Sequence, residues 1–244
     1  MSHLPNERTC VNLPMICIGH SHVACVARAA ENIGLRLRAI NFWEIPGALQ
    51  NKNGESRLSE TLEQELKQHS GAVFSMVGGA AHGILGMLVH PRRFDFVLPE
   101  EADLPLDPAA ELLPFGAVRG LLESLTADYL ALMTVLSNLC GDRFFHIESP
   151  PPYADASRMH SDIPWSMYPG MRQEISPAFF RYKLWRLHSR IVSDWCMSAG
   201  ATFVPCPTET MDENGFMREQ YYGDGAHANP AYGERVLVQM RQLA

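Results

Sequence analysis

Residues 14–22 read Pro-Met-Ile-Cys-Ile-Gly-His-Ser-His, and they indicate how the chain begins to fold. The four successive apolar residues 15–18 are typical of a short strand that is buried on both faces of a parallel sheet. The strand stops at a glycine, and Ser21 follows in a tight turn before a helical pattern over 23–33. A strand, a turn and a helix in this order predict the first unit of an α/β domain.

The same alternation of short apolar runs and helical patterns continues along the 244 residues. Apolar runs predict strands over 15–18, 36–42, 72–77, 143–147 and 202–205. Helical patterns lie over 23–33, 56–68, 108–139 and 177–199, and a last one opens at Asn229-Pro230. Because strands that alternate with helices build a parallel sheet covered on both faces, we expect one α/β domain over 1–244 with about five mainly parallel strands.

A few residues mark where helices are expected to end or begin. Gly34 suits the end of the first helix. Ser176-Pro177 predicts an N-cap followed by proline at the first helical position, and Asn229-Pro230 predicts the same arrangement. Within 108–139, Pro114 and Gly116 could break the helix.

Two long stretches match no strand or helix pattern, namely 92–108 and 149–176. The second begins Ser-Pro-Pro-Pro-Tyr and contains Trp165 and Tyr168. Loops of this length without regular structure are often lids or binding loops. We therefore expect 149–176 to form a lid or insertion, with Trp165 and Tyr168 either lining a substrate pocket or packed beneath the lid.

Composition argues against several classes of protein. A formal net charge of −7 disfavours a nucleic-acid surface, which would carry a basic patch. No stretch approaches the roughly 20 apolar residues needed to span a membrane, and residues 1–12 have no apolar signal-peptide core. We expect a cytoplasmic protein whose six cysteines, which form no Cys-x-x-Cys pair, are reduced and mostly buried. The sequence indicates nothing about oligomeric state.

Near the other end of the chain, residues 223–227 read Gly-Asp-Gly-Ala-His. Ligands of an open parallel sheet bind beyond the carboxyl ends of its strands, so Ser21 and this segment are expected at one edge. Ser21, His227 and Asp224 would then supply a nucleophile, a base and an orienting carboxylate. The structural alternatives are a helix N-cap for Ser21 and an ordinary polar turn for 223–227.

These segments resemble the first and last blocks of the SGNH (GDSL-type) hydrolase superfamily. The resemblance implies a flavodoxin-like, three-layer α/β/α fold with Ser21 as nucleophile, His227 as general base and Asp224 orienting the base. The family's third block is a strand followed by Gly-x-Asn, and here 72–77 runs into Gly-Gly-Ala. The resemblance therefore implies that the backbone N–H groups of Ser21 and Gly79 bind the oxyanion, aided by the N-terminus of the helix after Ser21.

Two positions depart from the family pattern. His20 precedes the serine where the family has Asp or Asn, and Ala80 stands where it has the oxyanion asparagine. Losing one oxyanion donor typically costs about a hundredfold to a thousandfold in turnover. His82 could donate in place of the missing amide, or it could be a buried histidine satisfied by a nearby carbonyl. Of His20 and His22, which flank the serine, at most one is expected to face the site.

We expect a serine hydrolase or acyltransferase that acts on an ester, thioester or similar small acyl substrate through a covalent acyl-serine intermediate, without a cofactor. One alternative is a catalytically degenerate binding protein on the same fold, motivated by His20 and Ala80. Another is a metal-dependent enzyme that uses His20, His22, His82 and His227. Their spacing matches no zinc signature, so no metal is expected.

Overall fold

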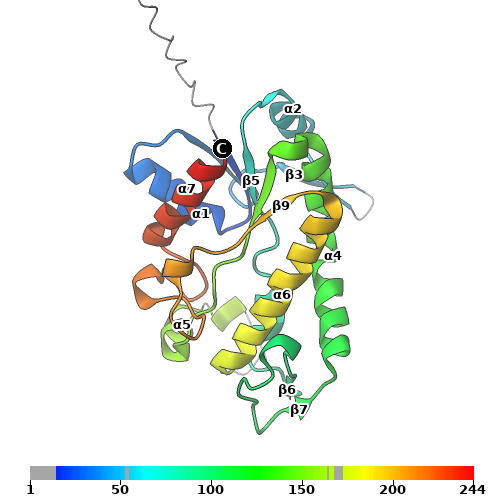
Figure 1. Ribbon diagram of the computed structural model, residues 1–244, viewed down its shortest axis with the longest axis vertical. Coiled ribbons are helices and arrows are strands. Elements are labelled where there is room, and N and C mark those ends of the chain that lie inside the picture. The colour runs from blue at the N-terminus through cyan, green and yellow to red at the C-terminus, as the bar shows by residue number, and fades with distance from the viewer. Residues whose placement is uncertain (1–14, 53–54, 164, 168–172) are drawn as a thin grey trace, which may run out of the picture.

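A five-stranded parallel sheet forms the centre of the computed structural model (Figure 1), which describes residues 15–52, 55–163, 165–167 and 173–244. Its strands lie in the order β2-β1-β5-β8-β9, and every neighbouring pair is parallel. Their bounds are Met15–Gly19 (β1), Leu37–Asn41 (β2), Val73–Met76 (β5), Phe144–Ile147 (β8) and Thr202–Val204 (β9). Numbered within this sheet alone, the order is 2-1-3-4-5, which is the flavodoxin-like arrangement. The predicted fold class and all five predicted strands are confirmed.

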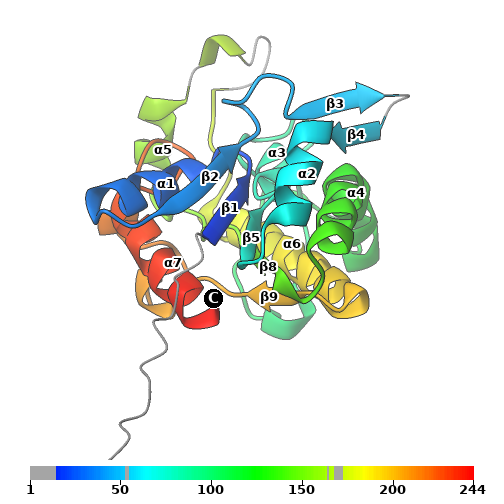
Figure 2. The ribbon, with the colours of Figure 1, turned by 90° about the horizontal axis from the view of Figure 1, so that it is seen from above.

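Helices cover both faces of the sheet, which gives three layers (Figure 2). One face carries α1 (Val23–Asn32) and α7 (Pro230–Leu243), and the other carries α2 (Glu60–Gln68), α4 (Phe115–Cys140) and α6 (Ala178–Ala199). Strand β1 is fully buried and alternates between the layers, with Met15 and Cys17 in the first core and Ile16 and Ile18 in the second. A strand that is buried on both faces must be apolar throughout, as the opening stretch of sequence predicted.

The helix predicted over 56–68 was wrong in its first residues. Residues Glu55–Leu58 form β4, which pairs antiparallel with β3 (Leu49–Lys52). Helix α2 begins only after Ser59, whose Oγ accepts a hydrogen bond from the Leu62 N–H at 3.3 Å. Leu58 is buried in the same core as Leu62, so the four-residue apolar spacing continued across the boundary.

Two further helix starts differ from prediction, both beside a proline. Helix α4 begins at Phe115 and not at residue 108 as predicted, because Pro114 takes an extended conformation. Residues 108–114 instead include β7 (Glu111–Leu112), which pairs with β6 (Phe94–Asp95). Helix α6 begins at Ala178 with Pro177 in the cap position, so Ser176 makes no cap. By contrast, Asn229 is confirmed as the N-cap of α7. Its Oδ1 accepts hydrogen bonds from the backbone N–H groups of Ala231 and Tyr232.

The predicted lid region 149–176 contains short helices. After an extended run, α5 (Ala156–Asp162) begins at the N-cap Asp155, and Trp165–Met167 forms a 3-10 turn. Residues 164 and 168–172, including Tyr168, lie outside the described residues. Another short helix that was not predicted, α3 (Ala81–Gly86), follows β5. Both α3 and the start of the lid region border the pocket described below.

Five cysteines are free and buried, as predicted, namely Cys17, Cys25, Cys140, Cys196 and Cys206. Cys10 lies outside the described residues. Burial raises the pKa of each of these thiols. Within the described ranges, no helix has the length and apolar character needed to cross a membrane.

The direction of strand order reverses between β1 and β5, which makes the carboxyl ends of these strands the expected ligand site. The two strands approach closely at Gly19, where an added Cβ would lie 2.5 Å from the carbonyl carbon of Met76. Glycine is therefore required at the end of β1. The loop that carries Ser21 and the loop that carries Gly79 consequently leave the sheet side by side.

Candidate active site

Asp224 and His227 form a hydrogen-bonded pair in the loop before α7. The His227 Nδ1 atom lies 2.8 Å from Asp224 Oδ1 and 3.0 Å from Oδ2. Since a carboxylate only accepts, Nδ1 carries the proton and Nε2 is left as the basic nitrogen. The hydrogen bond from His227, together with that from the Ala226 N–H, lowers the pKa of Asp224 to about 2. The pair therefore has the geometry of an oriented general base.

Tyr153 fastens the loop that carries this pair. Its phenolic oxygen lies within hydrogen-bonding distance of the carbonyl oxygens of Asp224, at 2.6 Å, and His227, and it accepts from the Gly223 N–H at 3.0 Å. The ring stacks on Tyr222 with centroids 3.8 Å apart. Sequence reasoning missed this role, although the tyrosine directly follows the proline run that opens the lid region.

Ser21 lies half-buried in the turn between β1 and α1. The next residue, His22, is buried, and its ring contacts that of His227 edge-on, with centroids 5.4 Å apart. The structure therefore brings the loop of Ser21 against the Asp224–His227 pair. Ser21 itself is not among the described residues that line the adjoining pocket, whereas His22 is.

Of the two histidines that flank Ser21, His22 faces the pocket and His20 does not, in line with the expectation that at most one would do so. His20 packs against the rings of Phe42, Trp43 and Tyr129, each with a centroid 5.4 Å away. Its Nδ1 accepts a hydrogen bond from the Gly78 N–H at 3.3 Å. His20 thereby links the β1 loop to the β5 loop.

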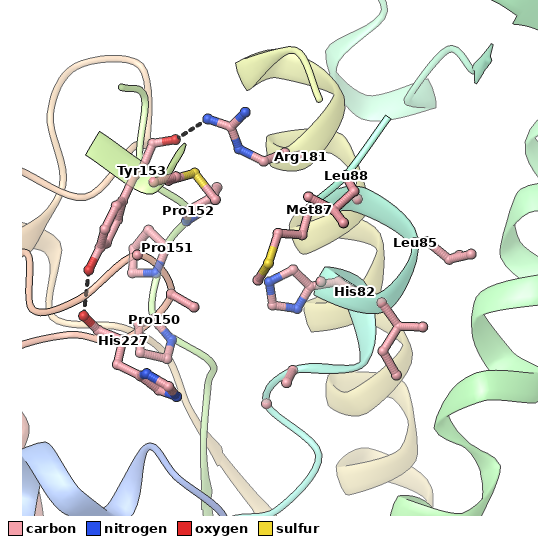
Figure 3. A pocket seen from close by; sticks show the side chains of 18 of the residues that line it. His82, Leu85, Met87, Leu88, Pro150, Pro151, Pro152, Tyr153, Arg181 and His227 are labelled. Atoms are coloured by element: carbon pink, nitrogen blue, oxygen red, sulfur yellow. Dashed lines mark hydrogen bonds between the residues drawn. The ribbon is translucent and has the colours of Figure 1, made fainter. Parts of the chain in front are cut away.

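A pocket of about 450 Å³ opens beside His227, between α3 and the run Pro150–Pro151–Pro152–Tyr153 (Figure 3). Its size is typical of a small-molecule site. Figure 3 shows His82 and Met87 on one wall, the proline run on the other, and His227 at one end. Most of the lining is apolar, and it includes Ile84, Leu85, Met87, Leu88 and Met159. The arrangement suits an apolar group placed next to the base.

Gly79, Ala80 and His82 all line this pocket. Ala80 precedes the first residue of α3 and offers no side-chain donor. His82 is half-buried, its Nδ1 atom is buried without a hydrogen-bond partner, and its ring lies 5.3 Å from that of His188. Burial is the main cause that holds the pKa of His82 well below its usual value, and the neighbouring His188 and His22 lower it further. His82 is therefore a neutral imidazole at the pocket wall.

Trp165 lies away from the described pocket lining and packs on α5 instead. Its Nε1–H donates to the His160 carbonyl oxygen at 3.1 Å, and the two rings lie 4.8 Å apart. The pocket contact from the lid region comes from its first residues and from Met159 of α5.

The described parts of the chain contain no group of three or more His, Cys, Asp or Glu side chains placed to hold a metal ion. In particular, His20 is not among the described residues that line the pocket, whereas His22, His82 and His227 line it.

No protein-family model matches the sequence, and no curated protein matches it. Similar solved structures include a GDSL-like lipase from Bacteroides thetaiotaomicron (14% identity, TM-score 0.43, covering 94% of this chain and 86% of that one). A second is a putative platelet activating factor from Streptococcus pneumonia (15% identity, TM-score 0.44, covering 97% of this chain and 87% of that one). A third is an aryl esterase from M. smegmatis (13% identity, TM-score 0.42, covering 94% of this chain and 97% of that one). Identities and TM-scores this low do not transfer an activity to this chain.

Proposed function

We propose that this protein is an SGNH-type serine hydrolase or acyltransferase that acts on an ester or thioester of a small, apolar acyl group. The observation that carries the proposal is the Asp224–His227 pair, which lies at the end of an apolar pocket and against the loop of Ser21. The pair orients a base, the pocket accepts an acyl chain, and Ser21 is the candidate nucleophile that the sequence pattern assigns.

In the proposed reaction, Ser21 Oγ attacks the acyl carbonyl carbon while His227 Nε2 takes the hydroxyl proton. The carbonyl oxygen becomes an oxyanion, which the backbone N–H groups of Ser21 and Gly79 bind. The bond to the leaving group then breaks, and His227 returns the proton to that group. Water, or another alcohol or amine, attacks acyl-Ser21 in the second half, and His227 again accepts and returns the proton.

Whether water or another acceptor takes the acyl group depends on how well the closed site excludes water. The residues that open the lid region form one wall of the pocket, so this region would also shape the acceptor side. We propose that the lid determines the balance between hydrolysis and transfer.

The first experiment is labelling with a fluorophosphonate probe followed by peptide mass mapping, on wild type and on Ser21→Ala. The proposal expects an adduct on Ser21 that the variant loses. Folded wild-type protein that takes no label would refute an activated serine.

The absence of a side-chain donor at Ala80 favours a second candidate, a binding protein on a degenerate hydrolase fold. It predicts saturable binding of a small ester or carboxylate without labelling of Ser21. The labelling experiment therefore separates the two candidates directly.

Gly83 provides a test of the pocket as the acyl site. An added Cβ there would meet only the Met87 Cε atom, at 3.9 Å, so Gly83→Leu is expected to fit the helix and fill pocket volume. If the new leucine side chain excludes three methylenes of an octanoyl chain from the pocket, each worth about 0.8 kcal/mol, kcat/KM for the octanoyl ester should fall roughly fiftyfold. An acetyl ester should be unaffected.

The matched control for Gly83→Leu is Gly116→Leu. Gly116 is exposed on α4, away from the described pocket lining, with no atom within 4 Å of an added Cβ. Its chain-length profile should match wild type. Equal losses for octanoyl and acetyl esters in Gly83→Leu would contradict an acyl chain in this pocket.

Tyr153→Phe tests whether the loop that carries the base must be held in place. The variant keeps the stacking on Tyr222 but removes a buried hydroxyl, a loss of about 1–3 kcal/mol in hydrogen bonding. We expect kcat to fall about tenfold or more, because Asp224 and His227 would sample other positions, with KM nearly unchanged. Steady-state kinetics and a thermal melt measure both effects, and an unchanged kcat would show that the phenol is dispensable.

A further inference from the structure

The space beside Gly79, where a donor for the oxyanion is needed, is filled by the ring of His22. A Cβ added to Gly79 would lie 2.8 Å from His22 Cδ2 and 3.4 Å from His22 Nε2. The same Cβ would be 3.0 Å from Ser149 Oγ, which donates to the Gly79 carbonyl oxygen at 2.6 Å. Gly79 is thus the residue that lets this imidazole edge approach the backbone.

The surroundings of His22 indicate which nitrogen carries the proton. Its Nδ1 is buried without a hydrogen-bond partner. An orphaned buried N–H is rarer and costlier than an orphaned acceptor, so the proton is expected on Nε2. Burial, and then the neighbouring His227, lower the pKa of His22 to about 3, so the ring is neutral near pH 7. A neutral imidazole with its N–H at Nε2 can only donate from the edge that faces Gly79.

We propose that the His22 Nε2–H donates a hydrogen bond to the oxyanion and takes the place of the side-chain amide that is absent at Ala80. The proposal rests on the proposed function and adds a catalytic residue to it. His22 directly follows Ser21, contacts His227, borders Gly79 and lines the pocket. It therefore lies among the nucleophile, the base and the backbone donor.

His82 is the rival donor, and its position is less favourable. It lies one residue into α3 and pairs with His188 on α6 rather than with the catalytic pair. The three heavy atoms nearest to a Cβ added at Gly79 belong to His22 and Ser149, not to His82, and it is the His22 ring that packs on His227. On this geometry, His82 forms pocket wall and His22 reaches the reacting oxygen.

The test compares His22→Leu, which removes the donor, with His22→Gln, which keeps an N–H at the end of a side chain of similar length. His22→Leu should lower kcat about a hundredfold to a thousandfold with KM nearly unchanged, and His22→Gln should recover at least tenfold of this loss. His146→Gln is the matched control, since His146 is also a buried neutral imidazole but does not line the described pocket. Its kcat should match wild type.

A trifluoromethyl ketone and its unreactive methyl ketone analogue provide a second readout. Only the first forms a tetrahedral oxyanion on serine, so His22→Leu should weaken its binding in proportion to the loss of kcat and leave methyl ketone binding unchanged. Equal weakening of both ketones, or a shifted acid limb in the pH profile of kcat/KM, would mean that His22 only positions His227 and would overturn the proposal.

The outcomes also separate this proposal from the proposed function. If wild-type Ser21 is labelled and turns over an ester, yet His22→Leu matches wild type, only the role of His22 fails. A severe loss of kcat in His82→Leu with a mild loss in His22→Leu would assign the oxyanion donor to His82. That result would also overturn the proposed role of His22. If wild type is neither labelled nor active on any acyl ester, both proposals fail.

Discussion

Replacing Ser21 with alanine is expected to reduce turnover of an activated ester by about a thousandfold or more, without unfolding the protein. The hydroxyl is the only group lost, and the proposed reaction has no other nucleophile to form the acyl intermediate. Ser21 is half-buried in a turn, and the N-cap residue of α1 is His22, which makes no side-chain cap bond, so the Ser21 hydroxyl is not needed to start the helix. Initial rates and a thermal melt on the same sample measure the two effects.

The matched control is Ser198→Ala, which removes an exposed hydroxyl near the end of α6 that bonds only to the Trp195 carbonyl oxygen. Its turnover should equal that of wild type. A folded Ser21→Ala variant with unchanged turnover would rule out the covalent mechanism, and the binding-protein candidate would then be preferred.

The sheet could be predicted because each of its strands is a short apolar run between breaks in pattern. In β1 every residue is buried, so hydrophobicity alone located it, and parallel pairing followed from the helices between strands. The hairpin β3–β4 could not be found in this way. Its strands read Leu-Gln-Asn-Lys and Glu-Ser-Arg-Leu and so contain no apolar run, and Leu58 continues the apolar spacing of α2, so that strand and helix read as one element.

The pairing of Asp224 with His227 was predictable, because a linear motif carries it. Asp224 and His227 are three residues apart, and a local hydrogen bond joins them. The choice between His20 and His22 was not predictable, because it depends on Phe42 and Tyr129, which come from distant parts of the chain. The same holds for Tyr153, whose partners lie about 70 residues away in sequence.

The protein is expected to lose most of its stability between pH 6.5 and 4.5, because it holds four histidines in neutral form, three of them buried and His82 half-buried. Burial lowers the pKa of His22 and His146 to about 3 and of His188 to about 4, and holds that of His82 well below its usual value. In the unfolded chain the same groups titrate near 6.5. Below that pH the unfolded state binds more protons than the folded state, so folding stability falls as pH falls.

The size of the effect follows from the number of groups. Each of the three fully buried histidines, His22, His146 and His188, removes about 1.4 kcal/mol per pH unit below 6.5, so together they remove roughly 4 kcal/mol by pH 5.5 and about 8 kcal/mol by pH 4.5. Total stabilities of about 5–15 kcal/mol are typical of proteins, so unfolding is expected within this window. Urea denaturation at pH 7.5, 5.5 and 4.5, followed by circular dichroism, measures the loss.

His188→Leu tests whether the buried histidines are the cause. Both ring nitrogens of His188 are buried without hydrogen-bond partners, so leucine removes a titrating group and leaves no polar partner unsatisfied. The stability difference between pH 7.5 and 5.5 should shrink by about 1.4 kcal/mol relative to wild type. Asp224 cannot produce this difference, because its lowered pKa of about 2 makes its contribution present above about pH 3.8 and lost only below that value. Equal wild-type stability at pH 7.5 and 5.5 would therefore mean that these histidines do not remain buried and neutral in the folded protein.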